Sequence, residues 1–258
     1  MLEAPRWSQT PRQHHPPEDR CAESCGSVYS VLVTSHISLF PLNTILVPGL
    51  VLPLHIFEPR YRLMVQELLE IPDEDEREFG VVSIRDGHDI TTLGIDALHP
   101  IGISAIMREV TPSEDGRYDI VTTGARRFTV KAVDTSSPLL SADVEWRPEP
   151  VPVESAELSL LTKSTLSEFA AYRAALSGEL NSNVSIFEEL PKDPVVVGYL
   201  LTAAILLPTD ERQALLGAET AESRLELVRT LLRRETSLIQ HFGALPAIDL
   251  LTDNFSSN

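Results

Sequence analysis

The sequence predicts an α+β protein in which a closed or half-closed β-barrel precedes a C-terminal bundle of α-helices. Residues 37–146 contain many short strand-like segments and one helix, without the strand–helix alternation that marks a parallel sheet. Residues 147–152 form a proline-rich break, and beyond it apolar residues recur at helical spacing. We therefore expect four segments: a disordered leader over 1–35, a barrel over 36–148, a helical bundle over 149–243 and a flexible tail over 244–258.

The first part of the expected barrel is rich in proline. Residues 37–42 alternate like a strand, and the apolar run 45–57 is interrupted by Pro48, Gly49 and Pro53. Because proline lacks the N–H group that a strand ladder needs, this run predicts short strands with kinks or bulges. The next segment, 59–71, is expected to be an amphipathic helix. Pro59 suits its first position, and an apolar face is formed by Tyr61, Met64 or Val65, and Leu68.

An acidic segment, residues 73–78, separates this helix from the remaining strands. We expect it to be a solvated loop and not a metal site, because bunched carboxylates on flexible chain lose entropy when they converge. Alternating apolar residues then predict strands at 79–84, 100–110, 118–123 with its continuation 124–133, and 139–146, with a turn at 113–116.

Helical periodicity marks the second half of the chain. A single apolar stripe over Leu158, Leu161, Thr165, Phe169, Tyr172 and Leu176 predicts a helix that Ser177 and Gly178 end. Asp193 is the expected N-cap of a helix over 194–207. A short helix capped by Thr209 or Asp210 and closed by Gly217 follows, and the last helix spans 221–242.

Composition and charge exclude several classes of protein. The chain has 21 Lys+Arg and 38 Asp+Glu among 258 residues, a formal net charge of −17, so nucleic acids and anionic membranes are not expected partners. Its two cysteines, Cys21 and Cys25, exclude a disulfide framework and a four-cysteine zinc site. The polar start lacks the apolar core of a signal peptide, and the apolar run 195–207 is too short to cross a bilayer. We expect a soluble, cytoplasmic protein.

Catalytic motifs are absent from the sequence. It contains no P-loop, no G-x-S-x-G elbow, no G-x-G-x-x-G fingerprint and no H-E-x-x-H, so we expect neither an enzyme nor a cofactor. Ser159 and Lys163 lie one helical turn apart, and a solvated surface pair is the preferred interpretation over a nucleophile pair. His55 is interpreted as a core or rim histidine bonded to backbone, and not as a general base. No metal site is expected either, because the histidines and cysteines of the leader form a chance cluster: His14, His15, Cys21 and Cys25.

Charged residues near two of the expected strands are interpreted as structural. Glu58 is expected to bond the first-turn N–H groups of the helix after it, while Arg60 pairs with a carboxylate. Arg126 and Arg127 point to opposite faces of one strand, so one of them should be the buried partner of a carboxylate and the other exposed.

Several segments together resemble the N-terminal, substrate-binding domain of Lon proteases. They are 39–42, 48–49, 52–62 and 124–128 in the first half and 190–194, 213–216 and 224–235 in the second. The resemblance covers roughly residues 37 to 242 and implies a PUA-like β-barrel followed by a helical bundle. It also implies a set of fold-defining positions: Pro41, Pro48, Gly49, Pro53, Glu58, Pro59, Arg60, Gly124, Arg127 and Phe128.

In full-length Lon this region helps to recognise unfolded or tagged substrates and supports the hexamer. The present sequence stops before any ATPase or Ser–Lys protease module, so the resemblance implies binding without catalysis. We expect a hydrophobic groove between barrel and bundle to capture polypeptide segments, with a separate ATP-dependent protease as a further partner. The expected lining residues are Leu50, Leu52, His55, Phe57 and Tyr61.

Two other functions remain open. An RNA-binding PUA-like module is disfavoured by the net charge of −17, since phosphate contacts supply most of such affinity. A small-molecule sensor or a cryptic hydrolase is the second alternative, and the hydrolase would use Ser159.

Overall fold

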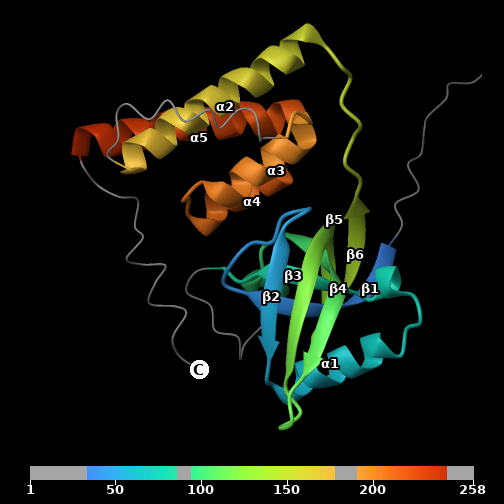
Figure 1. Ribbon diagram of the computed structural model, residues 1–258. Coiled ribbons are helices and arrows are strands. Elements are labelled where there is room, and N and C mark those ends of the chain that lie inside the picture. The colour runs from blue at the N-terminus through green and yellow to red at the C-terminus, as the bar shows by residue number, and fades with distance from the viewer. Residues whose placement is uncertain (1–33, 86–93, 178–190, 243–258) are drawn as a thin grey trace, which may run out of the picture. The chain divides into compact units, whose positions relative to one another are not determined.

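The structure, a computed structural model, describes residues 34–85, 94–177 and 191–242, and it combines one mixed β-sheet with helices (Figure 1). The α+β class predicted from the sequence is confirmed. The tail and nearly all of the leader, with its histidines and cysteines, lie outside the described residues.

Among the described residues six strands form the sheet, in the order β2-β5-β4-β3-β1-β6. All paired neighbours are antiparallel except β1 and β3, which run parallel. The last part of β5 also pairs with β6, so the pairings of β5, β4, β3, β1 and β6 form a closed circuit, with β2 outside it. The bounds are β1 Thr34–Leu42, β2 Val51–Ile56, β3 Glu78–Ser83, β4 Ile101–Pro112, β5 Tyr118–Asp134 and β6 Ser141–Arg147.

A tight turn precedes β2 and shortens the strands expected over 45–57. Leu50 N–H donates to Val47 O at 3.2 Å, and Gly49 between them has φ +80°. Proline followed by glycine at positive φ is the pattern of a type II turn, so only residues 51–56 remain as strand. The turn packs against β5 at Gly124, where an added Cβ would lie 2.3 Å from Val47 O. Gly124 is therefore required by the close approach of two backbones.

Helix α1, Pro59–Leu69, turns its predicted face inward. Tyr61, Met64, Val65 and Leu68 are buried, and the Tyr61 ring lies 4.2 Å from that of Phe40 between centroids. Burial raises the pKa of the Tyr61 phenol to about 12, because the core disfavours the phenolate.

The prediction that the Glu58 side chain caps α1 is wrong. Glu58 occupies the N-cap position but makes no side-chain bond to the helix. Its carboxylate instead accepts a hydrogen bond from Arg60 Nε at 2.8 Å. The guanidinium of Arg60 thus takes the place of the first-turn N–H groups as donor to this carboxylate. The acidic segment after α1 forms a short 3-10 turn, η1 (Glu74–Glu76), whose side chains are exposed as expected for a solvated loop.

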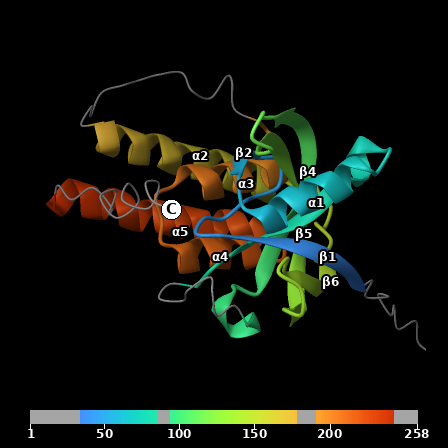
Figure 2. The same cartoon turned by 90° about the horizontal axis from the view of Figure 1, so that it is seen from below.

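In the part of the chain that the structure describes, four helices follow β6 and share one apolar cluster. Both views place α2 and α5 side by side along most of their length (Figures 1 and 2). Asp193 caps α3 as predicted, accepting from Val195 N–H and Val196 N–H at 2.8 and 3.1 Å. The bounds are α2 Ala156–Ser177, α3 Pro194–Ala204, α4 Thr209–Gly217 and α5 Ala221–Phe242.

The expected limits of the two short helices differ from the structure. Helix α3 ends at Ala204 and not at 207, because Ile205 is already extended with ψ 135°. Helix α4 has Pro208 as its N-cap, so Thr209 and Asp210 lie inside the first turn and do not cap it. Asp210 and Glu211 still favour this end of the helix electrostatically.

A buried ionic cluster joins the strands to the helices. Arg127 of β5 and Arg224 of α5 both bind Glu149, which follows β6, with N–O distances of 2.9 Å. The Tyr199 hydroxyl of α3 also donates to Glu149, and Arg224 stacks 4.0 Å above the Tyr199 ring. Of the two adjacent arginines on β5, Arg127 is thus buried against a carboxylate, while Arg126 is exposed and pairs with Glu78.

The same arginines close the end of α4. Arg127 donates to Leu216 O and Ala218 O, and Arg224 donates to Leu215 O and Ala218 O. A helix leaves its last carbonyl groups without intrahelical partners, so guanidinium groups at this end satisfy them and oppose the helix dipole. The apolar core continues through this junction, since Tyr199 and Leu216 belong to the cluster that fills the space between the sheet and α1.

Candidate functional site

Strand β2 forms the free edge of the sheet. Within the described residues it pairs with β5 and with no other strand, and Pro53 lies in its middle. Edge strands are where a sheet accommodates proline, because one row of backbone groups has no ladder partner. In Figure 1, β2 lies beside β5, and α1 lies near the end of these strands. This places the expected binding segment, residues 50–57, at an accessible border of the sheet.

The side chains of β2 alternate between two faces. Leu52, Leu54 and Ile56 point toward the core, whereas Val51, Pro53 and His55 are exposed. The exposed row continues at both ends with Leu50 and Phe57. The exposed fractions are 57% for Val51, 46% for Phe57 and 37% for Leu50, which are large values for apolar side chains so close together.

The five residues expected to line a groove therefore divide between two faces. Leu50, His55 and Phe57 lie on the open surface. Leu52 packs against the core, and Tyr61 is only 5% exposed on the inner face of α1. Successive residues of a strand point to opposite faces, so one strand cannot place Leu52 and His55 on the same side. The exposed members lie on the outer face of β2, and Val51 and Pro53 accompany them.

Strand register extends this outer face across β5 and β4. Val51 of β2 pairs with Thr123 of β5, which pairs in turn with Ile106 of β4. In the same way Pro53 pairs with Val121, which pairs in turn with Glu109. Paired residues share a face of the sheet. Val121, Thr123 and Ile106 are half-buried, and Glu109 is exposed. We name as the outer patch the exposed row of β2 with its neighbours on this face: Leu50, Val51, Pro53, His55, Phe57, Val121, Thr123 and Ile106, bordered by Asp119 and Glu109.

His55 has a carboxylate partner on the outer patch. Its Nδ1 lies 2.6 Å from Asp119 Oδ1, on the residue paired with it in β5. Its ring also stacks on Phe57, with centroids 6.2 Å apart and an angle of 28° between the planes. The expected backbone bond is replaced by this side-chain pair, because His55 points outward while backbone groups lie in the plane of the sheet. The pair fixes the imidazole beside Phe57 on the outer patch.

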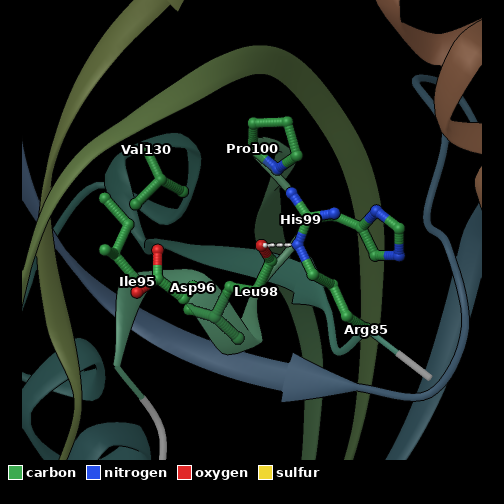
Figure 3. A pocket seen from close by; sticks show the side chains of 7 residues that line it. All are labelled: Arg85, Ile95, Asp96, Leu98, His99, Pro100 and Val130. Atoms are coloured by element: carbon green, nitrogen blue, oxygen red, sulfur yellow. Dashed lines mark hydrogen bonds between the residues drawn. The ribbon is translucent and has the colours of Figure 1, made fainter. Parts of the chain in front are cut away.

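A concave feature lies near the end of β3, apart from the outer patch. A cavity of about 390 Å³ is lined by Arg85, Ile95, Asp96, Leu98, His99, Pro100 and Val130 (Figure 3). Arg85 Nε donates to Leu98 O at 2.9 Å, and His99 Nε2 lies 3.8 Å from Asp210 Oδ1. None of the residues expected at a binding site takes part in this cavity, and its charged members Arg85 and Asp96 are exposed to solvent.

Two of the remaining candidates lie on α2, whereas the metal candidates His14, His15, Cys21 and Cys25 lie outside the described residues. Ser159 and Lys163 are both exposed on α2, as the solvated interpretation expects. Among the residues that the structure describes, no three His, Cys, Asp or Glu side chains lie close enough together to hold a metal ion. None of the helices in those same residues has the length and apolar character to cross a membrane.

The residues that β5 and β4 contribute to the outer patch were not expected from the sequence. Val121 and Ile106 lie on other strands, and only the register brings them beside Pro53 and Val51. Asp119 could have been suspected, because alternation along the expected strand 118–123 places Tyr118, Ile120 and Thr122 on one face and Asp119 on the other. The alternation of Val51, Pro53, His55 and Phe57 was also present in the sequence.

Comparison with known proteins identifies related chains. A family model described as the ATP-dependent protease La (LON) substrate-binding domain matches residues 36–234. The Lon protease of Anaeromyxobacter dehalogenans is 26% identical over 203 residues, covering 78% of this chain and 23% of that protein. The Lon protease of Escherichia coli K12 is 22% identical over 205 residues, covering 79% of this chain and 25% of that protein. The chain thus spans about a quarter of the length of the curated relatives it matches.

Solved structures agree in fold. The Lon N-terminal domain protein from Xanthomonas campestris has a TM-score of 0.55 and 24% identity, over 77% of this chain and 98% of that one. The N-terminal domain of the Mycobacterium avium complex Lon protease has a TM-score of 0.55 and 19% identity, over 79% and 98% respectively.

Proposed function

Because this chain belongs to the family of Lon substrate-binding domains, we propose that it binds exposed apolar segments of other polypeptides without catalysing a reaction. The observation that carries the proposal is the outer patch, where apolar side chains from a free edge strand remain exposed. The family match supports the class of ligand, since the matching part of the relatives is described by its substrate binding.

The chemistry of the patch suits an extended segment. Exposed Val51 and Phe57 would each lose apolar surface to water on binding, at about 25 cal/mol per Å² removed. The free edge of β2 is a weak template for an added strand, because Pro53 lacks a donor there. We therefore infer that side-chain contacts with the face provide most of the affinity, and that binding is transient, with Kd in the range of about 1–100 μM.

The same proposal covers the architecture and the biological setting. We infer a PUA-like β-barrel over 36–148, supported by the closed circuit of strand pairings, and a helical bundle over 149–243, supported by the shared apolar cluster of α2–α5. A cytoplasmic adaptor that presents segments to a separate ATP-dependent protease is the corresponding role. This role is supported by the matched region, which is a substrate-binding domain and makes up only 23% of the related Lon protease.

A binding titration tests the function. A fluorescent, unstructured peptide with five apolar residues between Ser-Gly flanks should bind with a Kd below about 100 μM, measured by fluorescence anisotropy. Val51→Ser with Phe57→Ser should weaken binding about tenfold or more, because both changes remove apolar contact area. Leu160→Ser is the matched control, since Leu160 is exposed on α2 and away from the patch. Absence of binding at 100 μM, or equal loss in the control, contradicts the proposal.

A further inference from the structure

We propose that the outer patch selects apolar segments that carry lysine or arginine beside the apolar residues. This inference rests on the proposed function and names the chemical class of the polypeptide. The patch joins exposed apolar side chains to two carboxylates, those of Asp119 and Glu109, on adjacent strands of one face. The occupant is therefore an extended cationic and apolar segment.

The carboxylates at the border are not neutralised by the arginines near them. Arg117 is close enough to respond to the charge of Asp119 but is bonded to Asp115, with an N–O distance of 2.5 Å. Asp119 itself pairs with His55 and keeps most of its side chain in solvent. The border at this point thus offers a carboxylate with room for a further donor.

Glu109 has the same character on the next strand. It is exposed, and within the described residues no ion pair involves it. The arginine next to it in sequence is engaged elsewhere, Arg108 with Asp75 at 2.5 Å. The outer patch consequently carries apolar surface and negative charge, and the nearby Arg108 and Arg117 are already paired with other carboxylates.

The spacing of these groups matches a short peptide. Neighbouring strands lie about 4.8 Å apart, so Asp119 is about 5 Å from the β2 row and Glu109 about 10 Å from it. Residues two positions apart along a strand are separated by about 7 Å. A lysine one or two residues from an apolar anchor on Val51 or Phe57 therefore reaches one of the carboxylates with its long side chain.

The charge of the whole chain acts in the same direction. A formal net charge of −17 attracts cationic segments at long range and repels acidic ones. At low salt this attraction raises the association rate of cationic segments. Exposed charge pairs are weak and screened, so selectivity should be modest and should shrink as ionic strength rises.

The inference is tested with three fluorescent peptides that share one apolar core and carry Lys, Ser or Glu flanks. Their affinities are measured by fluorescence anisotropy. At about 20 mM salt, Lys-flanked peptide should bind at least about fivefold more tightly than Ser-flanked peptide, and Glu-flanked peptide more weakly than both. Asp119→Asn with Glu109→Gln should reduce this difference to less than about twofold. The readout is the ratio of the two affinities within each variant, so a loss of affinity common to both peptides when His55 loses its partner does not affect it. Glu154→Gln with Glu226→Gln, an equal change of charge at two exposed positions outside the patch, is the control and should retain it.

The outcomes separate this inference from the proposed function. Equal affinity for Lys-flanked and Ser-flanked peptides overturns the inference and leaves the proposed function standing. No binding of any peptide overturns the proposed function itself. Loss of selectivity in the control pair shows attraction by net charge alone and overturns the assignment to the patch. If the double variant Val51→Ser with Phe57→Ser binds the Lys-flanked peptide as tightly as the unchanged protein does, the assignment to the patch is also overturned.

Discussion

Arg127 and Arg224 bind the same carboxylate, that of Glu149, although one lies on β5 and the other on α5. Arg224 is fully buried and Arg127 is 3% exposed, so two guanidinium groups share a single acid in the interior. Desolvation lowers the pKa of Arg127, which is the sign of a charge held in a poorly solvated place. The carbonyl groups at the end of α4 complete the coordination of both cations.

Removing the shared acid should be costly. Glu149→Ala leaves two buried guanidinium groups without a counter-ion, and we expect a loss of about 3–5 kcal/mol in the free energy of unfolding, measured by urea denaturation. Glu154→Ala is the control, since Glu154 is exposed in the same connecting segment. A loss below about 1 kcal/mol for Glu149→Ala would show that the cluster does not hold the helices to the sheet.

The turn before β2 should depend on Gly124. In Gly124→Ala the new Cβ would lie 2.3 Å from Val47 O, so the turn or the strand must move. We expect a destabilisation of about 1–3 kcal/mol by thermal or urea unfolding, with weaker peptide binding because the turn carries Leu50. Gly94→Ala, where an added Cβ meets nothing within 4 Å, should change stability little. Equal effects of the two substitutions would contradict the requirement for glycine at 124.

Alkaline pH should destabilise the fold through Tyr61. The pKa of this phenol is raised from 10.0 to about 12 by burial, so between these values the unfolded chain loses a proton that the folded chain keeps. Stability therefore falls as pH rises above 10, by up to about 1.4 kcal/mol per pH unit for this residue. Tyr61→Phe should show a shallower loss in urea denaturation at pH 9, 10 and 11. An identical pH dependence in both proteins would rule out this assignment.

The pattern of apolar residues predicted the elements with good accuracy where the period was clear. Helix α5 has the predicted bounds, and α1 buries the predicted face. The run 45–57 was harder, because proline and glycine allow either a bulge or a turn and local sequence does not decide between them. The approach of Val47 to Gly124 decides for the turn, and that contact joins distant parts of the chain.

The candidate site was predicted only in part. The apolar segment 50–57 was expected to bind, and Leu50, His55 and Phe57 are exposed there. Leu52 and Tyr61 were expected beside them because they are apolar and near in sequence, but burial depends on which face of an element meets the core. The carboxylate partner of His55 lies 64 residues away and follows from strand register.

By itself, the sequence determined the family, the α+β class, the strongly acidic surface and the order of elements, because these depend on composition, on local periodicity and on motifs that are contiguous in the chain. Only the tertiary structure decided which half of the proposed binding segment faces water, which carboxylates border it, and that Glu149 binds two arginines. The physical reason is that register, face selection and ion pairing join residues far apart in sequence, and their energies are set by burial in the assembled fold.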